Sequence, residues 1–354
     1  MNVSPKSILA ASCADDYDPN SMPVVKAREL IARFLTPVSA IERLNIRAAL
    51  DRVLAEDVVS PLDVPAHDNS AMDGYAVRFA DLGSAGEVAL RIVGAAFAGV
   101  PFQGQIKAGE CVRIMTGGVV PAGCDTIVMQ EHAAAKGDTV SIGGGHKQGQ
   151  NFRHAGEDLK TGQVALKRGL LLRPAEIGLI ASLGIGEVGV FRRLRVAFFS
   201  TGDELRSIGT PLGAGQIYDS NRYTIHGMLA RLGCEAIDMG VVRDDPKLLE
   251  QAFADAAAAA DVVITSGGVS VGEADFVKDL LERLGEVVFW KIAMKPGRPL
   301  AYGRIANAHF FGLPGNPVSV MVTFYQFVRE ALLRLAGRDP VPPLPSFTVP
   351  CLSN

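Results

Sequence analysis

Residues 195–205 read RVAFFSTGDEL, in which an apolar run of strand length ends in small residues and two carboxylates. Later apolar runs have the same character: EAIDMGVV (235–242), DVVITS (261–266) and VVFWKIAM (287–294). Segments with helical patterns accompany them at 220–233, 246–260 and 274–284. Alternation of fully apolar strands with helices predicts a parallel or mixed sheet that is covered on both faces.

Polar residues follow each of these four runs, at the point where each strand should end. They are Asp203 and Glu204; Asp244 and Asp245; Gly267, Gly268, Ser270 and Asp275; and Lys295 and Arg298. Ligands of an open α/β sheet bind outside the carboxyl ends of its strands, so we expect these groups at one edge. Carboxylates suit Mg²⁺, a diglycine turn admits a phosphate, and Lys and Arg pair with anionic oxygens. The sequence therefore predicts a site for Mg²⁺ and a phosphorylated or nucleotide-bearing small molecule.

Taken singly, these segments have plainer interpretations. TGDEL and RDDP are also ordinary helix N-cap sequences, and Asp245 is expected to cap a helix over 246–260. The GGVSVG turn alone is weak support for a ligand site, because lone glycine patterns are common. Helices expected to begin at Glu204 and Asp275 would add a partial positive charge at the same edge. The joint occurrence of these polar segments at successive strand ends is what favours a functional site.

The N-terminal half has a different organisation. Helical spacing predicts helices at 24–34, 46–55 and 174–184, and a long final helix at 317–336. Between about 66 and 150, short β-like runs separated by Gly and Pro turns predict a small all-β module. Within it, HDNSAMDGYAV and RIMTGG have the composition of turns, which by itself does not distinguish them from ordinary loops.

Bulk composition excludes several classes of protein. A chain of 354 residues is too long for one core, and a net charge of −3 gives no reason to expect nucleic acid or an anionic membrane as a partner. No apolar run approaches the roughly 20 residues of a membrane span. Five scattered cysteines without a C-x-x-C pair indicate reduced thiols in the cytoplasm. Residues 1–22 lack the features of a signal peptide and are expected to form a disordered lead-in.

Several of these segments, in this order, closely resemble the motifs of the molybdopterin molybdenumtransferase family, known as MoeA and as the E domain of gephyrin. They are DNSAMDGYAV, RIMTGG, the GED at 156–158, FSTGDEL, GQIYDSNR, RDDP, TSGGVSVGEAD, MKPGRP and GLPGNPVS. The resemblance runs from about residue 23 to 337. It implies an elongated, multidomain chain of the α/β plus β class, with a three-layer α/β domain like that of molybdopterin-binding proteins, an inserted small β domain and an extended helical dimerisation domain.

The boundaries that follow are an extended helical or linker domain, an inserted β-rich domain, an α/β molybdopterin-binding domain and a short tail. They cover 23–62 with 156–190, 63–155, 191–337 and 338–354, respectively. Members usually continue into a C-terminal β-rich domain, and we expect it to be absent here because the sequence stops at Asn354.

The resemblance also implies a reaction and the residues that perform it. The expected activity is transfer of molybdate to the dithiolene of adenylylated molybdopterin, with Mg²⁺-dependent release of AMP, in a homodimer whose partners include other proteins of molybdenum-cofactor biosynthesis. The implied catalytic residues are Asp73, Thr116, Asp158, Glu204, Asp244, Asp275, Lys291 and Lys295. The implied cofactor-binding residues are Gly267, Gly268, Ser270, Asp275, Lys295, Arg298 and Pro299, and the implied metal ligands are Glu204, Asp244 and Asp275.

Two other functions are compatible with the sequence. A chain without the C-terminal domain could be a non-catalytic, dimeric scaffold that binds adenylylated molybdopterin without turning it over. The related α/β domain of the molybdopterin adenylyltransferases also contains a diglycine turn, so ATP-dependent adenylylation of molybdopterin is the second alternative. The β module and the DNSAMDGYAV segment favour the molybdenumtransferase.

Overall fold

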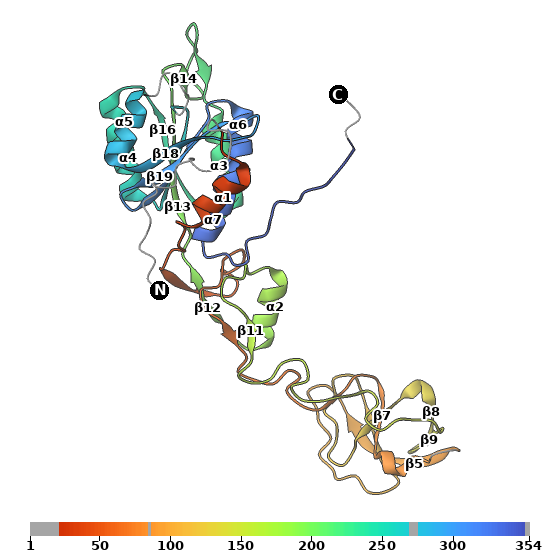
Figure 1. The fold of residues 1–354 in the computed structure, drawn as a ribbon. Coiled ribbons are helices and arrows are strands. Elements are labelled where there is room, and N and C mark those ends of the chain that lie inside the picture. The colour runs from red at the N-terminus through yellow and green to blue at the C-terminus, as the bar shows by residue number, and fades with distance from the viewer. Residues whose placement is uncertain (1–20, 84–85, 269–274, 351–354) are drawn as a thin grey trace, which may run out of the picture. The chain divides into compact units, whose positions relative to one another are not determined.

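The structure, a computed structural model, describes residues 21–83, 86–268 and 275–350, and it has a mixed α/β fold. The chain divides into two compact units (Figure 1). The larger unit contains the residues up to Glu56 and those from Lys167 onward, and the smaller unit is Asp57–Leu166. None of the helices in the described ranges is long and apolar enough to cross a membrane.

The larger unit is built on a mixed six-stranded sheet, as the alternation of strands and helices predicts. Its strands, in spatial order, are β16 (Glu235–Val242), β13 (Arg195–Thr201), β17 (Val262–Ser266), β20 (Ala308–Leu313), β19 (Pro299–Ile305) and β18 (Gly285–Lys291). The first four are parallel, and β19 is antiparallel to both β20 and β18. Two successive reversals give β18 the direction of the parallel strands, so its carboxyl end lies at the same edge as theirs.

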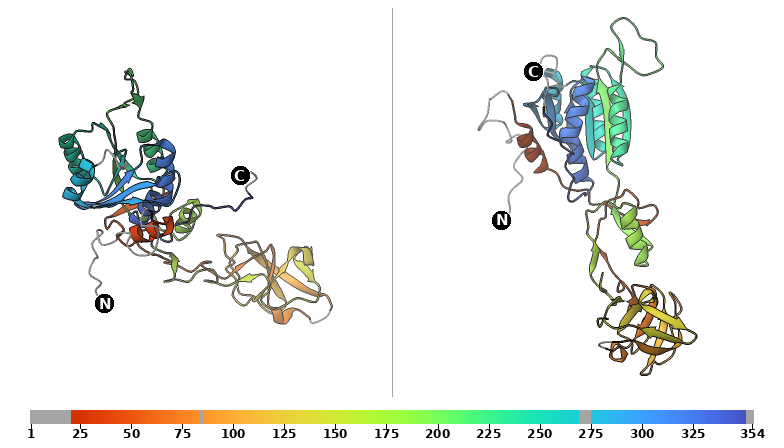
Figure 2. Two further views of the ribbon diagram at one scale, coloured as in Figure 1. Left: turned by 45° about the horizontal axis from the view of Figure 1, so that its top comes forward. Right: turned by 90° about the vertical axis from the view of Figure 1, so that its right-hand side faces the viewer.

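Helices cover both faces of this sheet (Figures 1 and 2). One face packs on α4 (Pro246–Ala259) and α5 (Asp275–Leu284). The other packs on α1 (Val24–Ala32), α3 (Asn221–Arg231), α6 (Pro317–Thr323), the π-helix η4 (Phe324–Val328) and α7 (Arg329–Leu335). Neighbouring residues of one strand point to opposite faces of the sheet. Phe198 packs in the apolar cluster beneath α1, α3, α6 and α7, and Phe199 packs in the cluster beneath α4 and α5. The result is a three-layer arrangement.

Short elements complete the larger unit. β1 (Ile41–Asn45) pairs with β12 (Glu187–Phe191), and β14 (Leu205–Arg206) pairs with β15 (Ile217–Tyr218). α2 (Pro174–Ser182) begins with a capping interaction in which Arg173 binds Glu176.

The smaller unit is a β module, as its short apolar runs and turns predict. Its six-stranded sheet has the order β7 (Thr126–Met129), β4 (Gly74–Val77), β6 (Glu110–Ile114), β5 (Val88–Ala96), β9 (Thr139–Ile142) and β8 (Ala133–Lys136). Two short pairs form separate two-stranded sheets: β2 (Val58–Val59) with β11 (Val164–Leu166), and β3 (Asn69–Ser70) with β10 (Phe152–Arg153). Single-turn 3₁₀ helices lie at Phe79–Asp81 and Gln130–His132. Two apolar clusters give this unit a core of its own.

Two predicted helices are wrong. Residues 46–55 form turns and isolated bridges, because the backbone of Leu54 pairs with Leu170 and that of Ala55 with Gly189, and Asp51 adopts a positive φ of 59°. No helix begins at Glu204 either, since its carbonyl accepts a hydrogen bond from the Ile217 N–H beside the β14–β15 pair. In both places the chain bonds to a distant segment that local sequence does not reveal.

Candidate functional site

The carboxyl ends of β13, β16, β17 and β18 share one edge of the sheet in the larger unit. The loops that leave these ends carry the residues that the sequence singled out. A further loop after β20 joins them, because the Gly267 N–H donates to Leu313 O at 3.1 Å and Ser266 Oγ donates to Pro314 O at 3.2 Å. The diglycine turn and the entry to α6 are therefore in direct contact.

Three cations occupy the segment 291–298 between β18 and β19, which we call the lysine loop. Lys291, Lys295 and Arg298 are all exposed. Within the described residues, no hydrogen bond or ion pair involves any of these three side chains, although other arginines of this unit form close pairs, such as Arg192 with Asp261. Pro299 is the first residue of β19, directly after this loop. The loop thus presents three positive charges to solvent.

The diglycine turn brings the backbone of Gly267 close to the backbone of Thr201. Gly267 and Gly268 have φ values of 92° and 69°, which side-chain-bearing residues rarely adopt. A Cβ added at Gly267 would lie 2.5 Å from Thr201 O, so no larger residue fits without a shift. The next predicted residue, Ser270, lies outside the described residues.

The predicted carboxylates sit at different places along this edge. Glu204 and Asp244 are exposed, and they follow β13 and β16, which are neighbours in the sheet. The Glu204 carboxylate folds back over Gly202, where an added Cβ would be 2.6 Å from Oε2. Asp275 begins α5, as predicted. Among the described residues, no group of three or more His, Cys, Asp or Glu side chains is close enough to hold a metal by itself.

Asp245 is a helix cap, as expected. Its carboxylate accepts hydrogen bonds from the Lys247 and Leu248 N–H groups at 3.0 Å each, at the start of α4. Neighbouring aspartates therefore differ, since Asp245 caps α4 and the exposed Asp244 does not.

Buried polar side chains under this edge were not singled out from the sequence. Asn221 donates from Nδ2 to Ser266 Oγ at 2.8 Å and to Gly315 O at 2.7 Å, which ties α3, β17 and the loop after β20 together. Ser200 Oγ donates to Asp219 Oδ1 at 3.0 Å. Asp219 and Asn221 fall inside the GQIYDSNR segment, so that motif was the available signal, but its composition alone is that of a turn.

The smaller unit holds the other three predicted residues. Asp73 precedes β4 and Thr116 follows the antiparallel β6, so the pairing of these strands brings them together. Asp73 Oδ1 accepts from Thr116 Oγ1 at 2.7 Å and from the Thr116 N–H at 2.8 Å, and these bonds hold the pKa of the Asp73 carboxyl below its usual value. Asp158 accepts from Arg153 Nη2 at 2.6 Å. Each carboxylate is thus held in place, Asp73 by Thr116 and Asp158 by its ion pair with Arg153.

Taken together, the larger unit offers exposed cations, exposed carboxylates and a glycine turn around one sheet edge. Free guanidinium and ammonium groups bind anionic oxygens, and carboxylate oxygens bind hard divalent cations. Such an edge can hold an anionic ligand that carries phosphate.

Two family patterns match this chain. The pattern described as "MoeA N-terminal region (domain I and II)" matches residues 22–184, and the pattern described as "Probable molybdopterin binding domain" matches residues 197–334. The second match covers the six-stranded sheet from the third residue of β13 onward, together with the helices packed on the sheet other than α1.

Curated relatives and solved structures agree with these patterns. The molybdopterin molybdenumtransferase of Haemophilus influenzae is 48% identical over 330 residues, which are 93% of this chain and 81% of that protein. The one from Nostoc is 40% identical over 303 residues, covering 84% of this chain and 70% of that protein. A crystal structure of a molybdopterin biosynthesis MoeA protein from Pyrococcus horikoshii superposes with a TM-score of 0.79 at 30% identity, covering 91% of this chain and 81% of that one.

Proposed function

The chain belongs to the molybdopterin molybdenumtransferase family and is a transferase of molybdenum-cofactor biosynthesis, and from this premise we propose the reaction it performs. It transfers molybdate to the dithiolene of adenylylated molybdopterin and releases AMP in a Mg²⁺-dependent step. The observation that carries this proposal is the lysine loop. Its three exposed cations have no hydrogen-bond or ion-pair partner among the described residues, and they lie at the sheet edge that also carries the diglycine turn.

The cations are proposed to hold molybdate. Lys295 and Arg298 supply donors for its oxygens, and Arg298 offers two parallel N–H groups where Lys295 acts as a point charge. A dianion in this loop would be attracted by three positive charges that have no competing carboxylate partner in the described residues. Lys291 adds the third of these charges at the end of β18.

The glycine turn and α5 are proposed to receive the phosphates of the adenylylated substrate. Glycines allow backbone N–H groups to approach a phosphate closely, and a helix start adds partial positive charge. Gly267 and Gly268 have the required backbone conformation, and we propose that Ser270, Asp275 and Pro299 complete the contacts with this ligand.

The carboxylates fit Mg²⁺. This ion usually binds proteins through one or two carboxylates and completes its shell with water and substrate phosphate, so a ready-made cluster of three is not required. Glu204 and Asp244, exposed at the ends of adjacent strands, meet that need, and Asp275 is proposed as the third ligand. When bound, Mg²⁺ would neutralise charge that develops as the pyrophosphate bond breaks.

The smaller unit is proposed to contribute Asp73, Thr116 and Asp158 to catalysis. The Thr116 hydroxyl and amide fix the orientation of the Asp73 carboxylate, and Arg153 does the same for Asp158. An oriented carboxylate can position a substrate hydroxyl or amine at little entropic cost. Substitution of Asp73 by Asn, which keeps the shape and removes the charge, tests this role directly.

An assay with adenylylated molybdopterin tests the proposed reaction against its alternatives. With Mg²⁺ and molybdate present, the chain should release AMP in proportion to inserted molybdenum. Tight binding of the substrate without AMP release would establish a non-catalytic scaffold instead. Consumption of ATP with molybdopterin and no need for molybdate would establish an adenylyltransferase.

We also propose that the chain acts as a homodimer. Light scattering on the purified protein should give twice the chain mass of 37.4 kDa. A monomer at assay concentrations that still turns over would contradict the dimeric state and leave the reaction itself standing.

A further inference from the structure

The lysine loop has little internal support. Its ends are joined by the Ile292 N–H, which donates to Arg298 O at 2.6 Å, and within it the Met294 N–H donates to Ile292 O at 2.8 Å. β18, from which the loop emerges, is the outermost strand, and among the described residues no further strand pairs with its far side. A loop with so few bonds keeps its geometry only if other segments hold it.

Met22 supplies such contacts at the free side of β18. The Met22 N–H donates to Lys291 O at 2.6 Å, and Met22 O accepts from the Ala293 N–H at 2.7 Å. Together they form a parallel bridge between Met22 and Ile292. The Met22 side chain is only 3% exposed and belongs to the same apolar cluster as Trp290 and Ile292. The backbone of Met22 is thus hydrogen-bonded to both ends of the stretch Lys291–Ala293.

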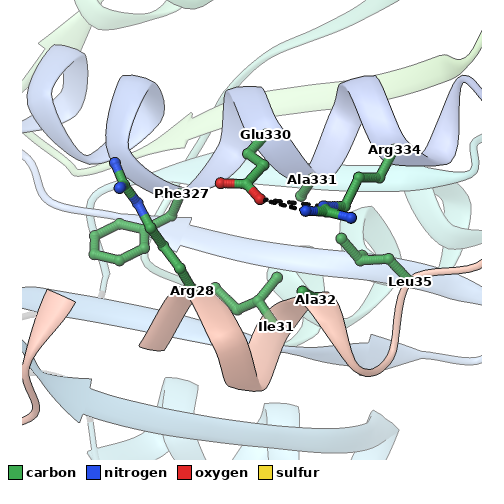
Figure 3. Close-up of a pocket in the computed structure, with 8 residues that line it drawn as sticks. All are labelled: Arg28, Ile31, Ala32, Leu35, Phe327, Glu330, Ala331 and Arg334. Atoms are coloured by element: carbon green, nitrogen blue, oxygen red, sulfur yellow. Dashed lines mark hydrogen bonds and ion pairs between the residues drawn. The ribbon is translucent and has the colours of Figure 1, made fainter. Parts of the chain in front are cut away.

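Helix α1 fixes Met22 to the body of the sheet. It begins two residues later and buries Ala27 and Ile31 in the apolar cluster. Arg28 Nε donates to Gln326 O at 2.7 Å, and its guanidinium also binds the Gln326 side chain, both within the π-helix η4. Figure 3 shows Arg28 and Ile31 of α1 directed toward the helix that carries Phe327.

The opposite side of the lysine loop is held by α6. Gly297 has a φ of 95°, and a Cβ added there would lie 2.8 Å from Thr323 Cγ2 and 2.7 Å from Met294 Cε. The loop backbone therefore touches α6 at Gly297 and the N-terminal segment at Lys291 and Ala293. Both supports are continuous with each other, since Arg28 binds η4, which directly follows α6.

From this arrangement we infer that the segment Met22–Arg28, here named the N-terminal clamp, is a positioning element for the lysine loop. It sets where Lys291, Lys295 and Arg298 stand and so sets the affinity for the oxyanion. The clamp touches no substrate. This inference rests on the proposed function, because it assigns the oxyanion to those three cations.

Two variants loosen the clamp from different ends. Met22→Pro removes the N–H that bonds Lys291 O, and Arg28→Leu removes both bonds to Gln326. Arg28→Lys retains one hydrogen-bond donor and should therefore keep most of the wild-type behaviour. Arg283→Leu is the matched control, since it breaks a surface ion pair with Glu250 between α5 and α4, which pack on the other face of the sheet from α1.

Two measurements on the full chain test the effect of these variants on the lysine loop. Hydrogen exchange of the Ala293 amide should be at least about tenfold faster in Met22→Pro and Arg28→Leu than in the wild type, while amides of β13 stay protected. In the AMP-release assay, KM for molybdate should rise about tenfold or more with kcat changed by less than about threefold, the signature of lost ground-state binding. The Arg283→Leu control should match the wild type in both.

The outcomes separate this inference from the proposed function. Faster exchange at Ala293 with an unchanged KM for molybdate would overturn the positioning role and leave the reaction intact. A parallel loss of kcat and of the melting temperature would also overturn it, because the clamp would then be purely structural. A wild-type chain that binds molybdate but releases no AMP would defeat the proposed reaction, and the molybdate affinities of the variants would still decide the role of the clamp.

Discussion

Adjacent aspartates give the sharpest contrast among individual side chains. Asp244→Asn should abolish AMP release, because it removes a proposed metal ligand and leaves the helix cap at Asp245 in place. Asp245→Ala should do the reverse. Loss of its two N-cap bonds should lower the free energy of unfolding by about 1 kcal/mol while AMP release persists. Normal turnover of Asp244→Asn would remove that residue from the proposed metal site.

Lys295 tests the charge argument. Lys295→Gln keeps much of the side-chain length and removes the charge, so KM for molybdate should rise about 10- to 100-fold, which corresponds to losing one charge-assisted contact. Lys136→Gln, at an exposed lysine on β8 of the smaller unit, is the control and should leave KM unchanged. If both variants behave alike, the lysine loop does not hold the oxyanion.

His309 gives the fold a pH dependence that is separate from catalysis. Burial lowers the pKa of this imidazole to about 4, and the side chain is only 6% exposed beside Tyr302. The unfolded state, with a pKa near 6.5, then binds more protons than the folded state between these values. Stability should be full above pH 6.5 and fall as the pH drops toward 4, by an amount on the order of 3 kcal/mol.

Chemical denaturation at pH 7.5 and pH 4.5 measures that loss. The variant His309→Gln, which cannot titrate, should lose much less stability between the two pH values than the wild type. Equal losses in both proteins would assign the acid sensitivity to other groups.

At the level of turns and strands, the diglycine turn can be tested by substituting Gly267. Gly267→Ala should lower the free energy of unfolding by roughly 1–3 kcal/mol, because φ is 92° and the new Cβ would meet Thr201 O. Gly227→Ala, inside α3 with open space around it, should be neutral or stabilising by up to about 1 kcal/mol. Similar effects at both positions, measured by urea denaturation, would contradict the strained-turn account.

The elements that the sequence predicted well are those whose pattern is local. The runs at 195–200 and 235–242 became β13 and β16, and the final helix formed with a π-helical turn at Phe324–Val328. The hairpin β19–β20 escaped notice, because Gly303, Arg304 and Asn307 interrupt the apolar pattern of strands that are nevertheless central. The Met22 bridge was equally invisible, since one backbone pair across 270 residues leaves no mark on composition.

The same distinction between local and long-range features applies to the candidate site. The sequence predicted that Glu204, Asp244, Gly267 and Lys295 share one edge, because each follows an apolar strand, and the sheet order places those strand ends there. Their roles in binding and catalysis are proposals. Asn221 could not be found that way. Its importance lies in bonds to Ser266 and Gly315, which belong to two other segments and meet only in the folded chain.

For the molecule as a whole, two units with separate cores carry the family's two matched regions. The smaller unit lies entirely within the first region, and the six-stranded sheet lies within the second except for the first two residues of β13. Likeness across 93% of the chain to a curated relative supports a shared reaction, and the lysine loop supplies a physical reason for it. The central claim is that one sheet edge receives both the oxyanion and the phosphate-bearing substrate.

The most direct test of that claim is the position of molybdenum in crystals soaked with molybdate and AMP, read from its anomalous scattering. The account predicts a molybdenum peak within hydrogen-bonding reach of Lys295 and Arg298, with the AMP phosphate at the turn formed by Gly267 and Gly268. A molybdenum peak bound elsewhere on the chain, with the lysine loop empty at saturating molybdate, would contradict it.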